Sequence, residues 1–353
     1  MTMLNRNLPG QTPQSIGIVG LGSLGSVLFQ ELIRVYSTRE DHSSETSDSS
    51  NFENTGQSAP LLIAYTSRPE DVEYIKTSAV FEALKTIDVQ IRPLQTLKHD
   101  IDLPQWLFLT VPDHVLPDIT SELSQNTFSN WSTKSVIHCS GAHSSVILDK
   151  LASFGARTAS LHPLQTFPSR AALYHYESTK SYSSDASHPS IRFFGIPCSV
   201  EGDVDLCTEL LDFFTEGLHA KAFRVSVEQK RALHLAAVLA SNGVVALFSS
   251  AREILRKAGI ENGFSLLQPL VEQTFKNVYL LGENALSGPA KRGDVSTVHI
   301  HLDDLKNAPE LQYRYALSGL MVLSLLPEEV QHQSGQEKLY QLFSEIVSRE
   351  PVQ

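Results

Sequence analysis

The sequence lacks the positive charge that marks nucleic-acid-binding proteins. Lys and Arg number 28 against 39 Asp and Glu, which gives a net charge of −11. A surface of this charge repels phosphate backbones and anionic lipid, so we expect neither a nucleic-acid nor a membrane partner. A small anionic substrate remains compatible, because a pocket can be locally basic on an acidic protein.

Cysteine is scarce, with Cys139, Cys198 and Cys207 the only three in 353 residues. An odd number of widely spaced cysteines argues against a disulfide framework or a zinc knuckle, and no metal site is predicted. Free thiols are typical of a reducing compartment, so we expect a cytoplasmic protein. Cys139 has no adjacent base in the sequence, and we interpret it as a packed thiol.

Long apolar runs are also missing. The most apolar stretch, residues 233–248, is shorter than the roughly 20 residues that span a membrane, and His234, Ser241 and Asn242 interrupt it. We interpret it as a buried core helix. Residues 1–15 are polar and lack the apolar core of a secretory signal, so we predict a disordered N-terminus there.

Short apolar runs alternate with helical spacers up to residue 225, and long helical patterns dominate from residue 226. This alternation predicts a fold of the α/β class, an N-terminal Rossmann doubly wound parallel sheet followed by an all-helical C-terminal domain. The expected domains are residues 16–225 and 226–330, with polar insertions at 37–60 and 174–190 and a tail or helix at 331–353. The strand-like runs are 16–19, 61–67, 106–111, 135–139, 158–161, 191–200 and 222–225, and the main helical patterns are 27–35, 69–83, 204–214, 227–258, 265–282 and 309–326.

A glycine-rich turn follows the first apolar run. Residues 20–25 read GLGSLG, the G-x-G-x-x-G pattern that binds a dinucleotide when it joins a strand to a helix. Gly20 permits the tight turn, Gly22 allows close approach of a pyrophosphate, and Gly25 lets the helix pack on the strand. Ser23 and Leu24 begin the helix, whose free N–H groups face the phosphates.

The second strand-like run ends in Tyr65, Thr66, Ser67 and Arg68. Dinucleotide sites selective for NAD place a carboxylate near this point, on the ribose 2′-hydroxyl. Ser67 and Arg68 can instead donate to a 2′-phosphate. We therefore predict NADP(H) as the cofactor.

Two further strand ends lie where a doubly wound sheet binds its ligand. Val111 and Pro112 end one strand, and Ser140 and Gly141 end the next. We expect these four residues to line the nicotinamide side of the site.

The segment SLHPLQTF, residues 160–167, places His162 at another strand end. Reduction of a carbonyl requires a proton donor for the alkoxide that forms, and histidine titrates in the useful range. A structural histidine bonded to a carbonyl is the other interpretation. Gln165 can bond a substrate oxygen or cap the loop.

The helix that begins near residue 227 carries a polar stripe. Lys230, His234 and Ser241 fall close to one face at 3.6 residues per turn, and Asn242 lies further round. Lys230 is a candidate proton donor or carboxylate ligand, and His234 and Asn242 are candidate catalytic residues that orient substrate. A solvated first turn and a satisfied core histidine are the structural alternatives.

A loop between the later helices reads SGPAKRGD at residues 287–294. Arg292 can bind a carboxylate through two hydrogen bonds. Asp294 can contact substrate or cap the following helix through its N–H groups.

These motifs together resemble a family of Rossmann-like proteins with a C-terminal domain of unknown function. The resemblance spans residues 16–326 and rests on the four motifs GLGSLG, HPLQTF, KRALHLAAVLASN and GPAKRGD. It implies kinship with ketopantoate reductases, pyrroline-5-carboxylate reductases, prephenate dehydrogenases and 6-phosphogluconate dehydrogenases, a C-terminal domain like that of the last of these, and a homodimer. It also implies oxidoreductase chemistry, with Lys230 in the position of the general acid of ketopantoate reductases and His162 like the histidine of prephenate dehydrogenases.

Three functions follow as hypotheses. The first is an NADP(H)-dependent oxidoreductase that reduces a small keto acid, ketopantoate first, or a related imine. The second is an NADP(H)-binding sensor or scaffold without turnover, because fold alone does not prove catalysis. The third is a dehydrogenase of the prephenate dehydrogenase type.

Overall fold

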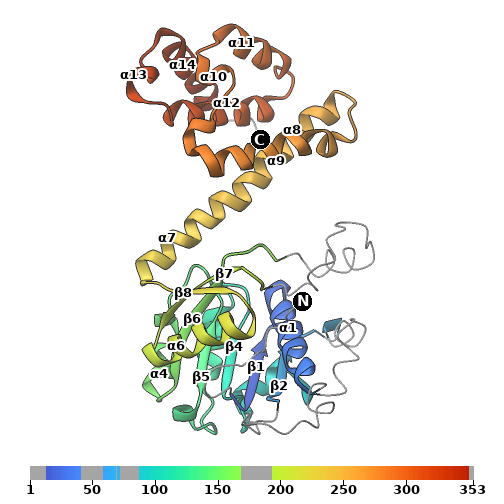
Figure 1. Ribbon diagram of the computed structural model, residues 1–353, viewed down its shortest axis with the longest axis vertical. Helices are drawn as coiled ribbons and strands as arrows, with labels where there is room; N and C mark the ends of the chain where they lie inside the picture. Colours follow the sequence, from blue (N-terminus) through green and yellow to red (C-terminus); the bar gives the residue numbers. More distant parts are fainter. Residues whose placement is uncertain (1–12, 41–58, 69, 72–86, 168–192, 350–353) are drawn as a thin grey trace, which may run out of the picture. The chain divides into compact units, whose positions relative to one another are not determined.

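The computed structural model describes residues 13–40, 59–68, 70–71, 87–167 and 193–349 (Figure 1). The polar insertion expected at 174–190 lies outside the described residues, as do most residues of the expected N-terminal segment 1–15, of the insertion 37–60 and of the helix 69–83. The chain divides into two compact units, Met1–Val238 and Leu239–Gln353.

The first unit is built on a sheet of eight strands. Its spatial order is β3-β2-β1-β4-β5-β6-β7-β8, in which β1 to β6 run parallel, β7 runs antiparallel to β6, and β8 runs parallel to β7. The first six strands have the 3-2-1-4-5-6 order of a Rossmann fold. The strands are β1 Ser15–Val19, β2 Leu61–Thr66, β3 Val89–Pro93, β4 Trp106–Leu109, β5 Ser135–His138, β6 Arg157–Pro163, β7 Pro197–Gly202 and β8 Lys221–Arg224.

Helices cover both faces of this sheet. Along β4, Phe108 faces a core that includes Leu32 of α1 and Phe214, whereas Leu107 and Leu109 face a second core on the other side. This alternation follows from the two-residue repeat of a strand. The helices of the unit are α1 Ser23–Glu40, α3 Leu116–Leu123, α4 Asp149–Ser153, α6 Val204–Asp212, with a π-helical turn at Phe213–Gly217, and α7 Val227–Val238.

The second unit contains helices and no strand among its described residues (Figure 1). Its core forms where α12 and α14 meet α11, around Val298, Ala316, Leu339 and Phe343. Gly319 permits the close approach, since a Cβ there would lie 2.3 Å from the Phe343 ring. The helices are α8 Val244–Lys257, α9 Gly263–Leu281, α10 Pro289–Arg292, α11 Val295–Asp304, α12 Pro309–Ser324, α13 Glu328–Gln331 and α14 Ser334–Ser348.

Three sequence-based expectations about the elements differ from the structure. The edge strand β3 was not expected, because its residues are polar and half-exposed rather than an apolar run. The expected strand at 191–200 begins only at Pro197, after a turn, and its antiparallel pairing was not foreseen. The expected continuous helix at 227–258 contains a π-helical turn at Leu239–Gly243, which is also where the two units divide.

The expected burial of residues 233–248 is wrong within the described chain. Leu235, Leu239 and Val245 are 64%, 67% and 64% exposed. By length and composition alone, one described helical stretch, Val227–Lys257, could cross a membrane, since an 18-residue window within it has a mean hydropathy of 1.7. Among the residues that the structure describes, the apolar side chains at Leu235, Leu239 and Val245 therefore do not belong to a core.

Candidate dinucleotide and active site

The glycine turn joins β1 to α1 with the geometry that its sequence predicts. Gly20 has a φ of 92°, a conformation that side chains disfavour, and its N–H donates to Tyr65 O at 2.9 Å. A Cβ on Gly25 would lie 2.0 Å from Gly20 O, and Thr110 Oγ1 donates to the same oxygen at 2.6 Å. Gly25 therefore allows α1 to pack directly on the turn.

Gly22 differs from Gly20 and Gly25 because the space beside its Cα is open. A Cβ built at Gly22 would meet nothing within 4 Å. Ser23 and Leu24 are the first residues of α1, so their N–H groups have no acceptor within the helix. The turn thus leaves room at Gly22 for a pyrophosphate beside a helix N-terminus, which favours anions.

The end of β2 presents a basic side chain without a carboxylate on the strand itself. Ser67 and Arg68 are exposed, and Arg68 N donates to Thr66 Oγ1 at 3.1 Å. Thr66 Oγ1 in turn donates to the carboxylate of Asp71, which is buried. The Asp71 carboxylate is thereby engaged by Thr66. The Arg68 side chain, in contrast, has no hydrogen bond or ion pair to any described residue.

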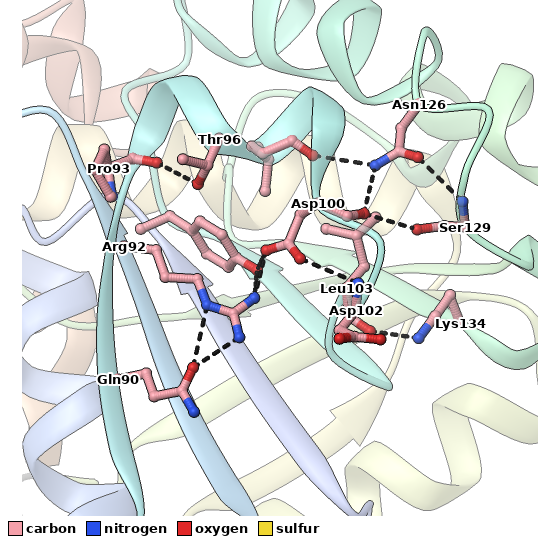
Figure 2. A network of polar contacts seen from close by, with 12 residues as sticks. Gln90, Arg92, Pro93, Thr96, Asp100, Asp102, Leu103, Asn126, Ser129 and Lys134 are labelled. Atoms are coloured by element: carbon pink, nitrogen blue, oxygen red, sulfur yellow. Dashed lines mark hydrogen bonds and ion pairs between the residues drawn. The ribbon is translucent and has the colours of Figure 1, made fainter.

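A second arginine lies one strand further along the sheet edge, but its guanidinium is already occupied (Figure 2). Arg92 Nη1 contacts Asp100 Oδ2 at 2.5 Å, and its Nε and Nη2 donate to Gln90 Oε1 at 3.2 and 2.7 Å. Tyr65 Oη also donates to Asp100 at 2.6 Å. Arg92 therefore ties β3 to the segment that precedes β4, and Arg68 is the better candidate for a phosphate.

The ends of β4, β5 and β6 bring three predicted segments together. Val111 lies against the glycine turn, since a Cβ on Gly20 would be 2.9 Å from Val111 Cγ1, and Pro112 follows it on the surface. A Cβ on Gly141 would be 2.2 Å from His234 Nδ1 and 2.7 Å from His162 Nε2. The backbone at Gly141 therefore lies directly against both histidine rings.

His162 and His234 form a pair. Their ring centroids are 5.4 Å apart, with the planes at 75°. Burial, followed by the neighbouring His234 and Lys230, lowers the pKa of His162 to about 4. His162 is therefore neutral near pH 7, where a neutral imidazole donates one hydrogen bond and accepts another. Its Nδ1 is buried with no hydrogen-bond partner among the described residues.

Lys230 lies in the same compact unit as His162, with its side chain 1% exposed. Its Nζ donates to Ser140 O at 2.8 Å and to His143 O, and it lies 3.9 Å from Glu201 Oε1. Burial lowers the pKa of Lys230 to about 8, an effect that Glu201 partly offsets. Lys230 and His162, the two candidate proton donors, therefore lie in the same compact unit, although the boundary expected at residue 226 assigned them to different domains.

Three residues of this site were not singled out from the sequence. His138, at the end of β5, is fully buried, and burial followed by the charge of Lys230 lowers its pKa to about 3. Glu201 is a buried carboxylate in β7, and His143 follows β5 in the adjoining loop. A charged residue within an otherwise apolar strand was the available signal for Glu201, because such a residue is rarely buried without a partner.

The remaining predicted residues are placed separately. Gln165 is exposed just after β6, and its Oε1 accepts from Thr166 N at 2.9 Å. Ser241 and Asn242 lie in the π-helical turn, which shifts them from the face that uniform helical spacing gives. They belong to the second unit, whereas Lys230 and His234 belong to the first.

The loop at 287–294 also belongs to the second unit. Arg292 is exposed at the end of α10. Asp294 caps α11, with Oδ1 accepting from Thr297 N at 3.1 Å and Oδ2 from Thr297 Oγ1 at 2.7 Å. These bonds lower the pKa of Asp294 to about 2. The geometry supports the capping interpretation of Asp294, and its contact with substrate stays a prediction.

The buried cysteines and possible metal ligands add no further chemistry. Burial raises the pKa of the Cys139 thiol to about 12, which supports its interpretation as a packed thiol. Within the described ranges, no cluster of His, Cys, Asp and Glu could hold a metal ion.

Strand order and glycine turn define a Rossmann-type α/β unit that is followed in the chain by a helical unit. Residues 196–321, about a third of the chain, match the family described as "Domain of unknown function (DUF2520)". No curated protein matches the sequence.

Solved structures with similar folds come from bacteria and a fungus. One is a Bacteroides fragilis protein assigned as an NADP oxidoreductase, 18% identical with a TM-score of 0.61, covering 88% of this chain and 98% of that one. Protein TM1727 from Thermotoga maritima is 20% identical with a TM-score of 0.52, covering 88% and 97%. A reductive aminase from Aspergillus terreus, in complex with NADPH4, cyclohexanone and allyl amine, is 12% identical, covering 96% and 95%, but its TM-score of 0.47 is too low to carry an argument. The first two structures confirm the predicted fold class, a Rossmann-type sheet with a helical region.

Proposed function

We propose that this chain is an NADP(H)-dependent oxidoreductase that reduces the carbonyl or imine group of a small substrate. The observation that carries this proposal is the shared edge of the sheet. The open turn at Gly22 and the paired rings of His162 and His234 both lie at the carboxyl ends of parallel strands, where doubly wound sheets bind dinucleotides and substrates. The fold similarity to a protein assigned as an NADP oxidoreductase supports the same class.

The residues at the sheet edge fit a phosphorylated dinucleotide. Gly22, Ser23 and Leu24 would hold the pyrophosphate, and Ser67 and Arg68 would hold the 2′-phosphate. The exposed Arg68 side chain has no partner among the described residues, whereas Arg92 is engaged by Gln90 and Asp100. Val111, Pro112, Ser140 and Gly141 would line the nicotinamide side.

When bound, NADPH supplies a hydride. The substrate atom that receives the released electron pair then needs a hydrogen-bond or proton donor. His162 is our choice for the hydrogen-bond donor, because its Nε2 lies beside Gly141 at the sheet edge and its low pKa keeps the ring neutral. A neutral imidazole holds no acidic proton near pH 7, so water would supply the proton that the alkoxide takes up. His234 would orient the ring of His162.

The substrate is a small keto acid or a related imine in this proposal, and ketopantoate is the first keto acid to test. The anionic group of a keto acid would need a cationic partner, for which Arg292 is the candidate, with Gln165, Ser241, Asn242 and Asp294 as further candidate substrate contacts. A protonated imine carries its own proton and would depend less on a donor, which suits a neutral His162.

A substrate panel tests this function. The full chain is mixed with NADPH and a set of keto acids and imines, and the loss of NADPH absorbance is followed, with NADP⁺ and prephenate as the reverse-direction arm. We expect oxidation of NADPH with at least one keto acid or imine, and the His162→Ala variant should lose roughly 10²–10⁴-fold in turnover while NADPH binding holds. NADPH binding without turnover in any arm would contradict catalysis and favour the sensor, and turnover of prephenate alone would favour the dehydrogenase.

A homodimer is the assembly we propose. Helices α8 and α9 expose large apolar side chains, among them Leu266 and Leu270 at 65% each, Tyr279 at 86% and Leu280 at 81%. Exposed apolar patches larger than a few hundred Å² mark interaction sites, and the acidic net charge argues against an anionic membrane. Light scattering should give twice the chain mass. A monomer in detergent-free buffer, or recovery only with lipid, would contradict the dimer.

The three cysteines of the described chain are free and buried, which suits the cytoplasmic location we propose.

A further inference from the structure

We infer that Lys230 and Glu201 are positioning residues that together hold residues 140–145, called here the 140–145 loop, against the rings of His162 and His234. The assignment differs from the general-acid role that the sequence suggested for Lys230. It rests on the proposed function in one respect, which is that His162 and Gly141 face the reacting groups.

The two charged side chains grip the loop at different points. Lys230 Nζ donates to Ser140 O at 2.8 Å and to His143 O. Glu201 accepts from Ser145 N at 2.6 Å and from Ser145 Oγ at 2.7 Å. The loop is therefore held through its carbonyls by a cation and through its donors by a carboxylate.

The two charges also neutralise each other. Nζ of Lys230 lies 3.9 Å from Oε1 of Glu201, and the side chains are 1% and 5% exposed. A buried charge is costly unless it is paired and hydrogen-bonded. Each residue is tolerated in the interior because the other residue and the loop satisfy it, so the pair and the loop form one unit.

The loop in turn fixes the histidine rings. Between the gripped points lies Gly141, where even a Cβ would come within 2.2 Å of His234 and 2.7 Å of His162. A contact this close leaves no room for the loop to move toward the rings. Two further hydrogen bonds hold the loop. Ser140 N donates to Nδ1 of His138, at the end of β5, at 3.2 Å, and His143 N donates to Ser140 Oγ within the loop at 3.0 Å.

Lys230 is poorly suited to donate a proton to substrate. Its ammonium hydrogens serve two backbone carbonyls and face Glu201, and its side chain is buried. Other charged or titratable groups act on it from the neighbouring elements, namely Cys139 after β5, Asp113 after β4 and Arg231 of α7. In addition, the charge of Lys230 lowers the pKa of both His138 and His162, so removal of that charge should raise both pKa values.

Histidine side-chain NMR on the full chain tests the inference without a substrate. Lys230→Met removes both the charge and the two donors to the loop. We expect the ring signals of His162 and His234 to shift and the pKa of His162 to rise toward its ordinary value. The matched control is Lys221→Met in β8, an exposed lysine whose loss removes the same charge elsewhere and should leave both rings unchanged. A folded Lys230→Met protein with unchanged His162 and His234 signals would overturn the inference.

Glu201→Gln and the double variant keep the test decisive if Lys230→Met fails to fold. Glu201→Gln keeps the shape but removes the charge that partners Lys230. We expect the double variant Lys230→Met with Glu201→Gln to be less destabilised than the sum of the single changes, because no buried charge is left unpaired. Full additivity of the two changes would overturn the pair.

Turnover separates this inference from the proposed function. If Lys230 acted only as a general acid, Lys230→Met would still raise the pKa of His162 because a charge is lost, but the nuclear Overhauser contacts between the 140–145 loop and the two rings would stay as in wild type and the loss would be confined to kcat, which contradicts positioning. If wild-type protein binds NADPH without oxidising any substrate, the proposed function fails, but the expected NMR shifts still stand or fall on their own. Lys230→Arg should restore part of the wild-type ring signals, because a guanidinium keeps the charge and donates to carbonyls.

Discussion

Substitution of Gly22 separates cofactor binding from folding more cleanly than any other change in the glycine turn. A Cβ at Gly22 would meet nothing within 4 Å, whereas a Cβ at Gly25 would lie 2.0 Å from Gly20 O and 2.5 Å from Thr110 Oγ1. Gly22→Ala should therefore change the free energy of unfolding by less than about 0.5 kcal/mol. Gly25→Ala forces α1 off the turn and should cost roughly 1–3 kcal/mol.

The expected effects on NADPH are different. The methyl group of Gly22→Ala occupies the space through which a pyrophosphate would approach the turn. Loss of one hydrogen bond to a charged group is worth about 1.5–3 kcal/mol, which is roughly a 10- to 150-fold loss of affinity. Gly25→Ala should lose affinity as well, but together with stability.

Two measurements on each variant check this reasoning. Thermal unfolding without ligand reports the fold, and calorimetric titration with NADPH reports the affinity. The reasoning is refuted if Gly22→Ala keeps the wild-type melting temperature and also binds NADPH as tightly as wild type, because the pyrophosphate then lies elsewhere.

Three further changes have defined outcomes. Arg68→Glu replaces attraction with repulsion at the 2′-phosphate, so NADPH should weaken roughly 10- to 150-fold in calorimetry and NADH far less; equal weakening of both would remove Arg68 from the ribose. Asp100→Ala removes the carboxylate that accepts from Tyr65 Oη and Arg92 Nη1 and should lower the free energy of unfolding by about 2–3 kcal/mol in urea titration, with wild-type stability as the contrary result. His138 and His162 have pKa values near 3 and 4 in the folded chain but about 6.5 when unfolded, so the unfolded chain binds more protons below about pH 6.5. Urea titrations should therefore show the free energy of unfolding falling by several kcal/mol as the pH drops below about 6.5. A constant free energy of unfolding between about pH 7 and 4.5 would contradict the buried neutral histidines.

The sequence was most informative where local chemistry alone determines structure. The strand, turn and helix around Gly20, Gly22 and Gly25 follow from conformational freedom and close approach, and the structure has them where the pattern places them. Apolar runs likewise located seven of the eight strands, at least in part, because buried strands carry a continuous apolar signal. The long helical patterns after residue 226 were found because apolar residues recur there at helical spacing.

The sequence was least informative where long-range contacts decide. Lys230 pairs with Glu201 in a strand that precedes it by 29 residues, and it bonds a loop nearly ninety residues away, which no local pattern records. The π-helical turn at Leu239–Gly243 changed the face on which Ser241 and Asn242 lie, because helical-wheel reasoning assumes uniform α-helical spacing. Leu239 and Val245 are exposed although they belong to an apolar run, because residue spacing predicts an apolar helix face without showing which surface that face contacts.

Binding of NADPH and NADH to the full-length wild-type chain tests the central claim most directly. Isothermal titration calorimetry at one salt concentration and pH 7 measures both affinities on the same protein. The open turn at Gly22 and the unpartnered Arg68 side chain among the described residues predict saturable binding of NADPH at one site per chain and much weaker binding of NADH. Absence of NADPH binding, or NADH binding as tight as that of NADPH, would contradict the account.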